Sequence, residues 1–319
     1  MSKPFASSAD IAPKTETLEL VADGVYALTA EGDPNVGAFE AEEFLVCIEA
    51  RATPVTAREW LTTMRKHTAK PVKFLILTHY HAVRVLGASA FDAESIITSD
   101  ITKKLIDERG KQDWDSEYGR MPRLFKSPES IPGLTHPTLT FRDHMTIDLG
   151  GKRGSLHLQF CGRGHTAGDI VVWHDKTKTL FTGDLVETQA ALYTGDAFHK
   201  DWSSETLDRL RQFRCENLIG GRGAVARGIA ATDAAIEQTR DFLKVMIERV
   251  GGVHQRTGTL KAAFQATHAA LAPKYGHWPI FEHCLPFNVQ RLWDEFDGID
   301  WPRIWTAERD KSVWAQLQD

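Results

Sequence analysis

The stretch FLILTHYHAVRVLGASAF, residues 74–91, is the part of the sequence that most limits the possible folds. Its first residues belong to an apolar run that predicts a strand over Lys73–Thr78, and His79 and His81 follow at the end of that strand. In extended backbone, residues i and i+2 point to the same face. The two imidazoles are therefore expected to lie where they can bind one cation together.

Three later segments place further polar residues at the ends of predicted strands. GRGHTAGDIVVW holds His165 in a glycine-flanked turn, TLFTGDLV places Asp184 at a strand end, and LIGGRGAVARG sets Arg222 in a glycine-rich turn. Together with the first stretch, these segments supply three imidazoles and one carboxylate, a donor set that suits zinc or non-haem iron. The candidate metal ligands are His79, His81, His165 and Asp184.

The order of these segments resembles the metallo-β-lactamase fold superfamily of metallo-hydrolases, over about Leu18 to Arg227. In that family one strand ends in H-x-H-x-D-H, a G-H-T-x-G-D/S turn follows, a later strand ends in F-x-G-D, and a G-H turn comes last. The resemblance implies a four-layer αββα sandwich of the α+β class, with the metals at one edge of its two sheets. It also implies that the three histidines hold a first metal and that Asp184 lies between two metal positions.

The chain departs from the family pattern at the positions that serve the second metal. The Asp and the last His of the first box are Val83 and Arg84, and the His of the final turn is Arg222. Valine has no ligand atom, while a guanidinium group stays charged, offers only donors and repels a cation. We therefore predict a mononuclear centre that binds one zinc ion, with Fe²⁺ as the alternative.

Two roles are open for Arg84 and Arg222. One or both could replace the charge of the missing metal and hold a carboxylate, phosphate or oxyanion of the substrate by forked hydrogen bonds. Alternatively, they form an internal ion pair with Asp184 or with a nearby acid such as Glu49, and such a pair would also orient a metal ligand. The two roles are compatible with each other.

Further candidates for the substrate pocket carry a weaker signal. Tyr193, Asp196 and His199 follow Asp184 along the chain, and His283 lies between helices of the predicted C-terminal region. Loop packing and capping are the favoured roles for the first three, and a hydrogen-bonded core position is favoured for His283, since a single histidine without ligand spacing is weak evidence.

Composition narrows the class of protein. Of 319 residues, 42% are hydrophobic and 25% are charged, which is ordinary for a folded chain and excludes a disordered one. With 38 Lys and Arg against 43 Asp and Glu, the net charge of −5 gives no sign of the positive surface that nucleic-acid binding requires.

Signals for a membrane or for secretion are missing from the sequence. No stretch reaches the roughly 18 apolar residues of a membrane span, and the first 13 residues lack the apolar core of a secretory signal. Four scattered cysteines without a C-x-x-C pair indicate reduced thiols and a cytoplasmic location.

Patterning predicts three parts: a flexible leader over residues 1–16, an αββα domain over 17–228, and a helical extension over 229–319 packed on that domain. Residues 110–140 are rich in charge, proline and glycine, which indicates an insertion or a lid-like segment. The longer helices are expected at Ala57–His67, Ile101–Arg109, Ser203–Phe213, Ala230–Val250, Thr259–Ala272 and Phe287–Phe296.

Three functions are compatible with these observations. The first is a zinc hydrolase that activates water against an ester, a lactone, a thioester or a similar small molecule, which is anionic if an arginine holds it. The second is a mononuclear iron oxygenase that resembles persulfide dioxygenases, with ligands at the positions of His79, His165 and Asp184. The third is a non-catalytic descendant that keeps the fold and a metal. A homodimer is possible, and neither nucleic acid nor a membrane is expected as a partner.

Overall fold

A computed structural model describes residues 4–318 of the chain, and within that range two mixed β-sheets pack face to face. The strands of the first sheet follow one another in chain order. They are β1 (Thr17–Ala22), β2 (Val25–Thr29), β3 (Val36–Glu40), β4 (Leu45–Ile48), β5 (Val72–Ile76), β6 (Ser95–Ser99) and β7 (Leu139–Phe141). Neighbours are antiparallel from β1 to β4 and parallel from β4 to β7.

The second sheet has the order β13-β12-β11-β10-β9-β8. Its strands are β8 (His144–Asp148), β9 (Ser155–Phe160), β10 (Ile170–His174), β11 (Thr179–Gly183), β12 (Asn217–Gly220) and β13 (Ala226–Arg227). All neighbours are antiparallel except β11 and β12, which run parallel. Strand β5 runs parallel to its two neighbours, and β11 runs parallel to β12. The loops that follow these strands therefore carry polar residues to one edge of the sandwich.

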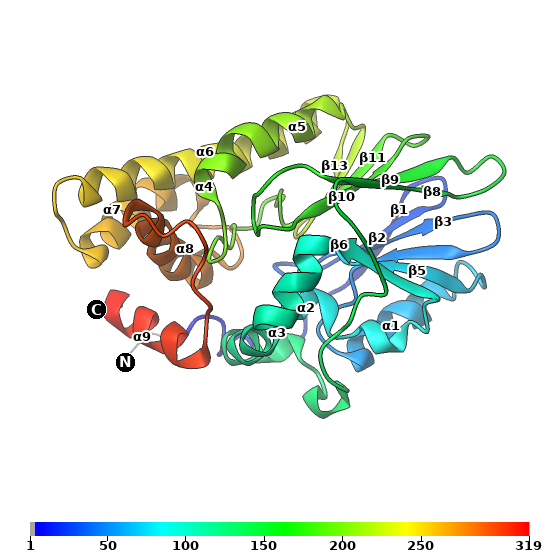
Figure 1. Ribbon diagram of the computed structural model, residues 1–319, viewed down its shortest axis with the longest axis horizontal. Coiled ribbons are helices and arrows are strands. Elements are labelled where there is room, and N and C mark those ends of the chain that lie inside the picture. The colour runs from blue at the N-terminus through cyan, green and yellow to red at the C-terminus, as the bar shows by residue number, and fades with distance from the viewer. Residues whose placement is uncertain (1–3, 319) are drawn as a thin grey trace.

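Three hydrophobic clusters define the layers of the sandwich. The inner faces of both sheets share one cluster, in which Phe39 and Ile76 of the first sheet meet Val172 and Phe181 of the second. The outer face of the first sheet packs on α1 (Pro54–Met64) and α2 (Ala82–Val85), and the outer face of the second packs on the later helices. Figure 1 shows this order of layers, with helices above and below the paired sheets. The predicted αββα sandwich is confirmed.

Local sequence explains where the first helices begin. Thr53 caps α1: its side chain accepts from the backbone N–H of Thr56, whose own hydroxyl accepts from the backbone N–H of Thr53. Trp60 and Met64 then bury one face of α1 against the first sheet. Ser99 caps the long α3 (Asp100–Arg120) in the same way, by accepting from the backbone of Thr102.

The prediction for residues 110–140 was wrong in its first third, because α3 continues to Arg120. Its second half buries a charged face rather than an apolar one, with Arg109, Asp113, Glu117 and Arg120 on the protein side. Hydrophobic periodicity is the signal that reveals a helix in a sequence, and a polar buried face removes it. The segment that follows contains only short turns, η2 (Pro122–Leu124) and η3 (Pro128–Ser130).

The helix predicted at Ser203–Phe213 is a composite. It starts with α4 (His199–Asp201), passes through one π-helical turn over Trp202–Thr206 and ends with α5 (Leu207–Gln212). The C-terminal helices lie where helices were predicted, with one addition. They are α6 (Ile229–His254), α7 (Leu260–Tyr275), α8 (Phe281–Phe296) and the unpredicted α9 (Ala307–Leu317).

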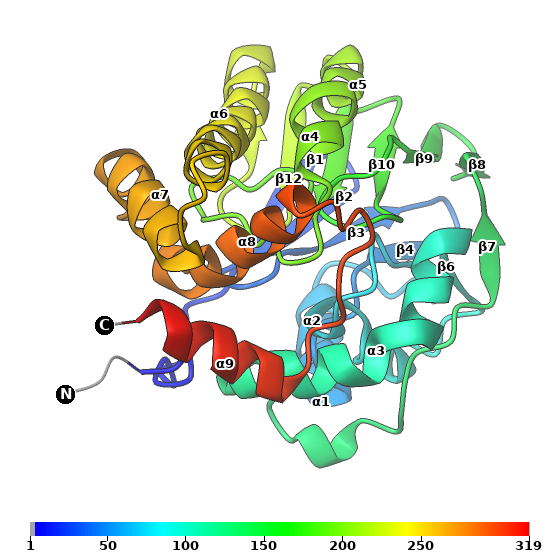
Figure 2. The same ribbon diagram turned by 60° about the vertical axis from the view of Figure 1, so that its left-hand side comes forward.

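Helices α6, α7 and α8 share one hydrophobic cluster with the outer face of the second sheet. Helix α9 instead lies along α3 and α8, beside the N-terminal segment (Figure 2). In that segment the Phe5 ring meets Trp314 at 5.7 Å between centroids, and Ser7 donates to the backbone carbonyl of Arg120. The domain limits at residues 16 and 228 stay predictions.

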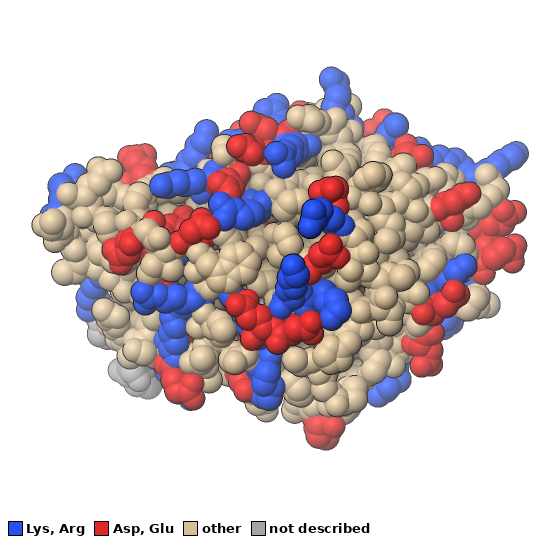
Figure 3. Space-filling model, viewed as in Figure 1, with Lys and Arg blue, Asp and Glu red and all other residues tan. Residues whose placement is uncertain are grey.

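Three properties of the described residues bear on the class of protein. None of the helices within residues 4–318 has the length and apolar character needed to span a bilayer. Lys and Arg side chains alternate with Asp and Glu over the face seen in Figure 3, in keeping with the nearly balanced composition. Over the same residues, the four cysteines are buried and unpaired.

Candidate metal centre

The structure brings the four candidate metal ligands together at one edge of the sandwich. His79 and His81 follow β5, His165 lies in the loop between β9 and β10, and Asp184 directly follows β11. One potential ligand atom of each lies within 4.8 Å of the others, and all four side chains are buried. The site is thus assembled from both sheets.

Hydrogen bonds set the orientation and the tautomer of two of the rings. The Nδ1 of His165 lies 2.9 Å from the backbone carbonyl of Tyr193, and the Nε2 of His81 lies 3.3 Å from a carboxylate oxygen of Asp196. A carbonyl and a carboxylate only accept, so both of these nitrogens carry the proton. The opposite nitrogens, Nε2 of His165 and Nδ1 of His81, are then left with lone pairs, and they lie 3.0 Å apart.

The third ring follows the same rule. The hydroxyl of Thr78 donates to the carboxylate of Glu49, so it accepts from Nδ1 of His79 at 2.9 Å. The Nε2 of His79 is buried, and within the described residues it has no hydrogen-bond partner. Three imidazole lone pairs therefore converge, which is unfavourable unless a cation lies between them, and the outer partners fix the rings as in metal sites. The residues present fit a bound metal ion.

The electrostatics of Asp184 agree with this interpretation. One of its oxygens lies 3.7 Å from Nε2 of His79 and 3.6 Å from Nε2 of His165. Burial acts to raise the pKa of this carboxyl, but Arg84, His79 and Arg222 outweigh burial and hold the pKa well below its usual range. Asp184 therefore stays an anion at the centre of the cluster.

The histidines differ in how they respond to burial. Burial lowers the pKa of His165 to about 3, so this ring is neutral and available as a ligand. Burial also disfavours the charged form of His81, but the carboxylates of Asp113 and Asp196 outweigh it and raise its pKa to about 9. His81 is thus placed to take a cation, either a proton or a metal ion, on its Nδ1.

The two arginines at the second-metal positions are both bound to Asp184. Arg84 is fully buried and donates to one carboxylate oxygen of Asp184, to the carbonyl of Asn35 at 3.0 Å and to that of Gly221 at 2.8 Å. Arg222 donates at 3.0 Å to the other oxygen of Asp184 and at 3.0 Å to Glu187. The structure therefore contains the internal ion pairs that were one of the two expected roles.

Helix α3 holds the segment between His81 and Arg84 in place. Asp113 accepts from the backbone N–H of Ala82 at 2.6 Å, and Glu117 accepts from that of Val83 at 2.8 Å. These acids satisfy the free N–H groups at the start of α2. Neither acid was among the predicted site residues, because acidic side chains in a charged stretch are usually exposed to solvent.

The weaker pocket candidates separate into two kinds. The Tyr193 ring packs on the centre, with its centroid 5.6 Å from that of His81 and 6.2 Å from that of His165. His199 is buried between Thr194, at 2.8 Å, and Glu295, at 3.3 Å. His283 is buried and shares a hydrogen bond of 2.8 Å with the Ser7 hydroxyl. Tyr193 thus borders the centre, and substrate roles for all three stay predictions.

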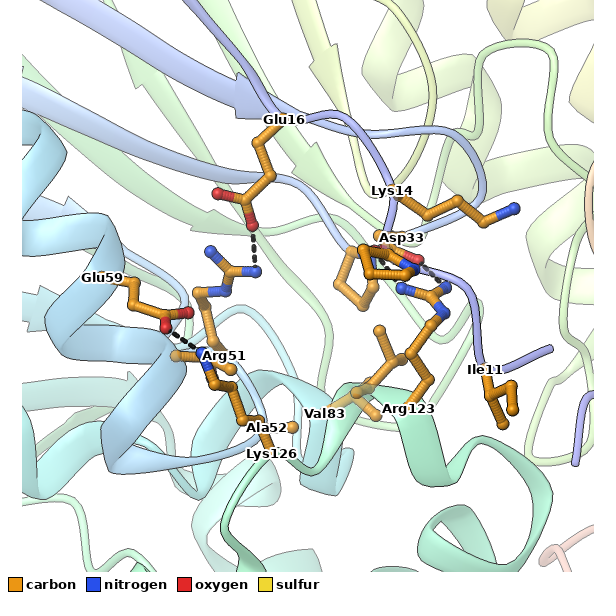
Figure 4. Close-up of a pocket in the computed structure, with 14 residues that line it drawn as sticks. Ile11, Lys14, Glu16, Asp33, Arg51, Ala52, Glu59, Val83, Arg123 and Lys126 are labelled. Atoms are coloured by element: carbon orange, nitrogen blue, oxygen red, sulfur yellow. Dashed lines mark hydrogen bonds and ion pairs between the residues drawn. The ribbon is translucent and has the colours of Figure 1, made fainter.

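A surface pocket of about 600 Å³ has Val83, the residue next to Arg84, in its wall. Figure 4 shows three ion pairs around it: Glu16 with Arg51, Glu59 with Lys126, and Asp33 with Arg123. The pocket does not include the four candidate ligands, which lie deeper. The loop around Pro34 and Asn35 separates the two, since Pro34 lines the pocket and the Asn35 carbonyl accepts from Arg84.

Comparison with known proteins identifies the family. The sequence profile of the metallo-beta-lactamase superfamily matches residues 56–222. This range covers more than half of the chain and contains all four candidate ligands. The chain belongs to the metallo-beta-lactamase superfamily.

Individual relatives are distant. A linear primary-alkylsulfatase from Pseudomonas sp. is 23% identical over 242 residues, which cover 64% of this chain and 44% of the relative. A metallo-beta-lactamase type 2 from Bacillus sp. strain 170 is 24% identical over 191 residues, which cover 57% of this chain and 63% of the relative. The chain therefore spans less than two thirds of the length of either relative.

Solved structures share the fold. A double mutant of the sec-alkyl sulfatase PisA1 matches with a TM-score of 0.66 and 15% identity, over 88% of this chain and 50% of that one. A metallo-beta-lactamase from Pontibacter korlensis matches with a TM-score of 0.57 and 21% identity, over 72% of this chain and 99% of that one. The likeness to the sulfatase therefore covers the larger share of this chain.

Proposed function

We propose that this chain is a metal-dependent hydrolase with a mononuclear zinc centre, acting on an ester, a lactone, a thioester or a similar small molecule. The observation that carries the proposal is that lone pairs of three imidazoles and a carboxylate oxygen of Asp184 lie within 4.8 Å of one another, while arginines fill the second-metal positions. The family relatives named above, an alkylsulfatase and a β-lactamase, support a hydrolytic reaction.

The division of roles follows from the contacts. His79, His81 and His165 would hold the ion through Nε2, Nδ1 and Nε2, the atoms that their other hydrogen bonds leave available. A zinc ion bound there supplies a Lewis acid and lowers the pKa of a bound water toward about 7. Asp184 would serve either as the fourth ligand or as the acceptor that orients the water.

The low pKa of Asp184 favours the ligand or orienting role over that of a strong base, because a carboxylate held as an anion by two arginines accepts a proton poorly. Arg84 and Arg222 keep Asp184 in place and keep fixed positive charge at the edge of the centre. Such preorganised charge stabilises negative charge that develops on a substrate oxygen.

The test is a screen of zinc-loaded protein against small esters, lactones and thioesters. We expect turnover that is lost on chelation and in His165→Ala, and retained in His136→Ala, whose side chain is 68% exposed and pairs with Asp107. Turnover that survives full removal of metal would contradict the proposal, as would the absence of hydrolysis in every substrate class with zinc bound.

A non-haem iron oxygenase is the second candidate, and it needs only two histidines and one carboxylate. One observation favours zinc: His81 faces the same point as the other ligands, with its Nδ1 3.0 Å from Nε2 of His165. A third converging imidazole is more typical of zinc. Bound iron with O₂ uptake would favour the oxygenase, and a protein that binds no metal would favour the non-catalytic descendant.

A further inference from the structure

A third buried arginine close to the metal centre has no hydrogen bond from its side chain. Arg120, at the end of α3, is 1% exposed, and within residues 4–318 none of its three guanidinium nitrogens has a hydrogen-bond partner. A buried guanidinium group whose nitrogens make no hydrogen bond is costly, and the Asp310 carboxyl group at 3.7 Å and the two aromatic rings beside it compensate its charge only in part. The arrangement therefore indicates that an acceptor from outside the protein chain belongs there.

The surroundings of Arg120 hold its guanidinium group in a fixed orientation. Its Nε edge faces Asp310 of α9 at 3.7 Å, while its central carbon lies 4.6 Å from the Tyr193 ring centroid and 5.0 Å from that of Phe287. The two terminal nitrogens are then left as a free fork. A fork with two parallel N–H donors matches the two oxygens of a carboxylate or a sulfate group.

Tyr193 links this arginine to the metal centre. One side of its ring lies near Arg120, and the ring also contacts His81 and His165. The hydroxyl of Tyr193 is buried and, in the described part of the chain, has no hydrogen-bond partner either. A second donor is thus available beside the guanidinium fork.

We propose that Arg120, assisted by the Tyr193 hydroxyl, is the anchor for an oxyanion on the substrate, and that the substrate is an organic carboxylate or sulfate rather than a neutral molecule. This inference rests on the proposed hydrolase function, because it takes the bound oxyanion to be part of a substrate. It assigns the anchoring role to Arg120 rather than to Arg84, whose two terminal nitrogens donate to Asn35, Asp184 and Gly221, or to Arg222, whose Nη1 donates to Asp184 and Glu187.

The N-terminal segment lies beside the end of α3 that carries Arg120, and Ser7 donates to the Arg120 carbonyl there. A small depression lined by Ser7, Met121 and Ile280 lies next to Arg120 in the chain, and it shares Asp33, Arg123 and Leu124 with the pocket of Figure 4. Ser7 ties the N-terminal segment to this end of α3 and to α8: its backbone N–H donates to the Arg120 carbonyl at 3.1 Å, and its hydroxyl shares a hydrogen bond of 2.8 Å with His283.

The experiment is isothermal titration of zinc-loaded protein with three probes of equal chain length: hexanoate, hexyl sulfate and hexanol. We expect both anions, or one of them, to bind the wild type and hexanol not to bind. In Arg120→Gln the affinity for the anion should fall about tenfold or more, the loss of one charge-assisted forked contact. Arg120→Lys keeps the charge but not the fork, and should lie between the two.

Controls separate anchoring from a structural role and from failure of the proposed function. Arg240→Gln removes another largely buried arginine, one whose donors are already bound to the Ser203 carbonyl and to Asp208, and should leave anion affinity unchanged. Tyr193→Phe removes only a hydroxyl and should weaken binding by a smaller factor than Arg120→Gln. Zinc content is measured in every sample, so loss of the metal centre is recognised independently.

Three outcomes would overturn the anchor. The first is anion affinity in Arg120→Gln or Arg120→Lys equal to that of the wild type. The second is hexanol binding as tightly as the two anions. The third is a wild type that holds zinc but binds neither anion at millimolar concentration, which would show that Arg120 has a structural role alone.

Discussion

The candidate metal centre has a histidine half and an arginine half. Both are built on the ends of the same two sheets, but their electrostatics are opposite. In one half, His79, His81 and His165 each donate one ring proton to an acceptor behind them and present a lone pair to the centre. In the other half, Arg84 of α2 and Arg222 of the loop after β12 donate to the carboxylate of Asp184. The comparison shows that a position suited to a cation can be taken by a guanidinium group when a shared anion lies between the halves.

Asp184 is that shared anion, and it ties the two halves together. Its oxygens accept from both arginines and face two of the histidines. Substitutions in the two halves should therefore have different consequences. Loss of a histidine should abolish metal binding, whereas loss of the ion pairs with the arginines should mainly affect stability and the position of Asp184.

The largest expected effect is on metal binding. His79→Ala removes one of three converging nitrogens, and we expect no metal to remain after dialysis, measured by elemental analysis. Because the ring lies in a buried site with its own hydrogen bond to Thr78, a fold check by circular dichroism belongs beside it. A variant that is folded and keeps one zinc per chain would exclude His79 as a ligand.

Asp184→Asn should produce the largest loss of stability. It removes the acidic partner of Arg84 and leaves Arg222 with Glu187 alone, and breaking a buried pair in this way costs about 3–5 kcal/mol. Urea unfolding of metal-free protein measures this directly. The control is Asp241→Asn, which breaks the exposed pair with Lys274 and should cost less than about 1 kcal/mol. Equal losses in the two variants would show that the arginines do not depend on Asp184.

Asp196→Asn should weaken metal binding without abolishing it. Asp196 accepts from Nε2 of His81, and loss of such an outer carboxylate reduces metal affinity by about 10–100-fold. Competition with a chelator of known affinity gives the ratio of dissociation constants. An unchanged ratio would mean that the backbone alone sets the orientation of His81.

Arg222→Lys should have the smallest effect. It keeps the charge beside Asp184 and Glu187 and loses only the shape of the guanidinium, so we expect a loss of about 1 kcal/mol and an unchanged KM. A KM for an anionic substrate that rises by tenfold or more would return the anchoring role to Arg222 and weaken the case for Arg120.

The sequence was sufficient for the fold and for the four candidate ligands, because both depend on local signals. Apolar runs such as Phe74–Leu77 mark buried strands, and the residues that end those strands reach one edge by topology. Strands β1, β3 and β13 were not predicted: β1 is largely unburied, β3, VGAFE, carries small residues at positions where a strand usually has large apolar ones, and β13 has only two residues.

The residues that support the candidate ligands were harder to predict, because their roles depend on contacts between segments that are distant in the sequence. Glu49 reaches His79 only through the Thr78 hydroxyl, and burial raises its pKa to about 8. Asp113 and Glu117 lie on a helix whose buried face is charged, and the pattern of Arg120 in the sequence does not differ from that of an exposed arginine. Only the packing of α3 against α9 and the Tyr193 loop gives these residues their roles.

The most direct test of the two-halves account is the metal stoichiometry of wild-type protein purified without added metal, then titrated with zinc. The account predicts about one tightly bound zinc per chain and no second tight site, because Arg84 and Arg222 fill the second position. Two tightly bound ions per chain would contradict it.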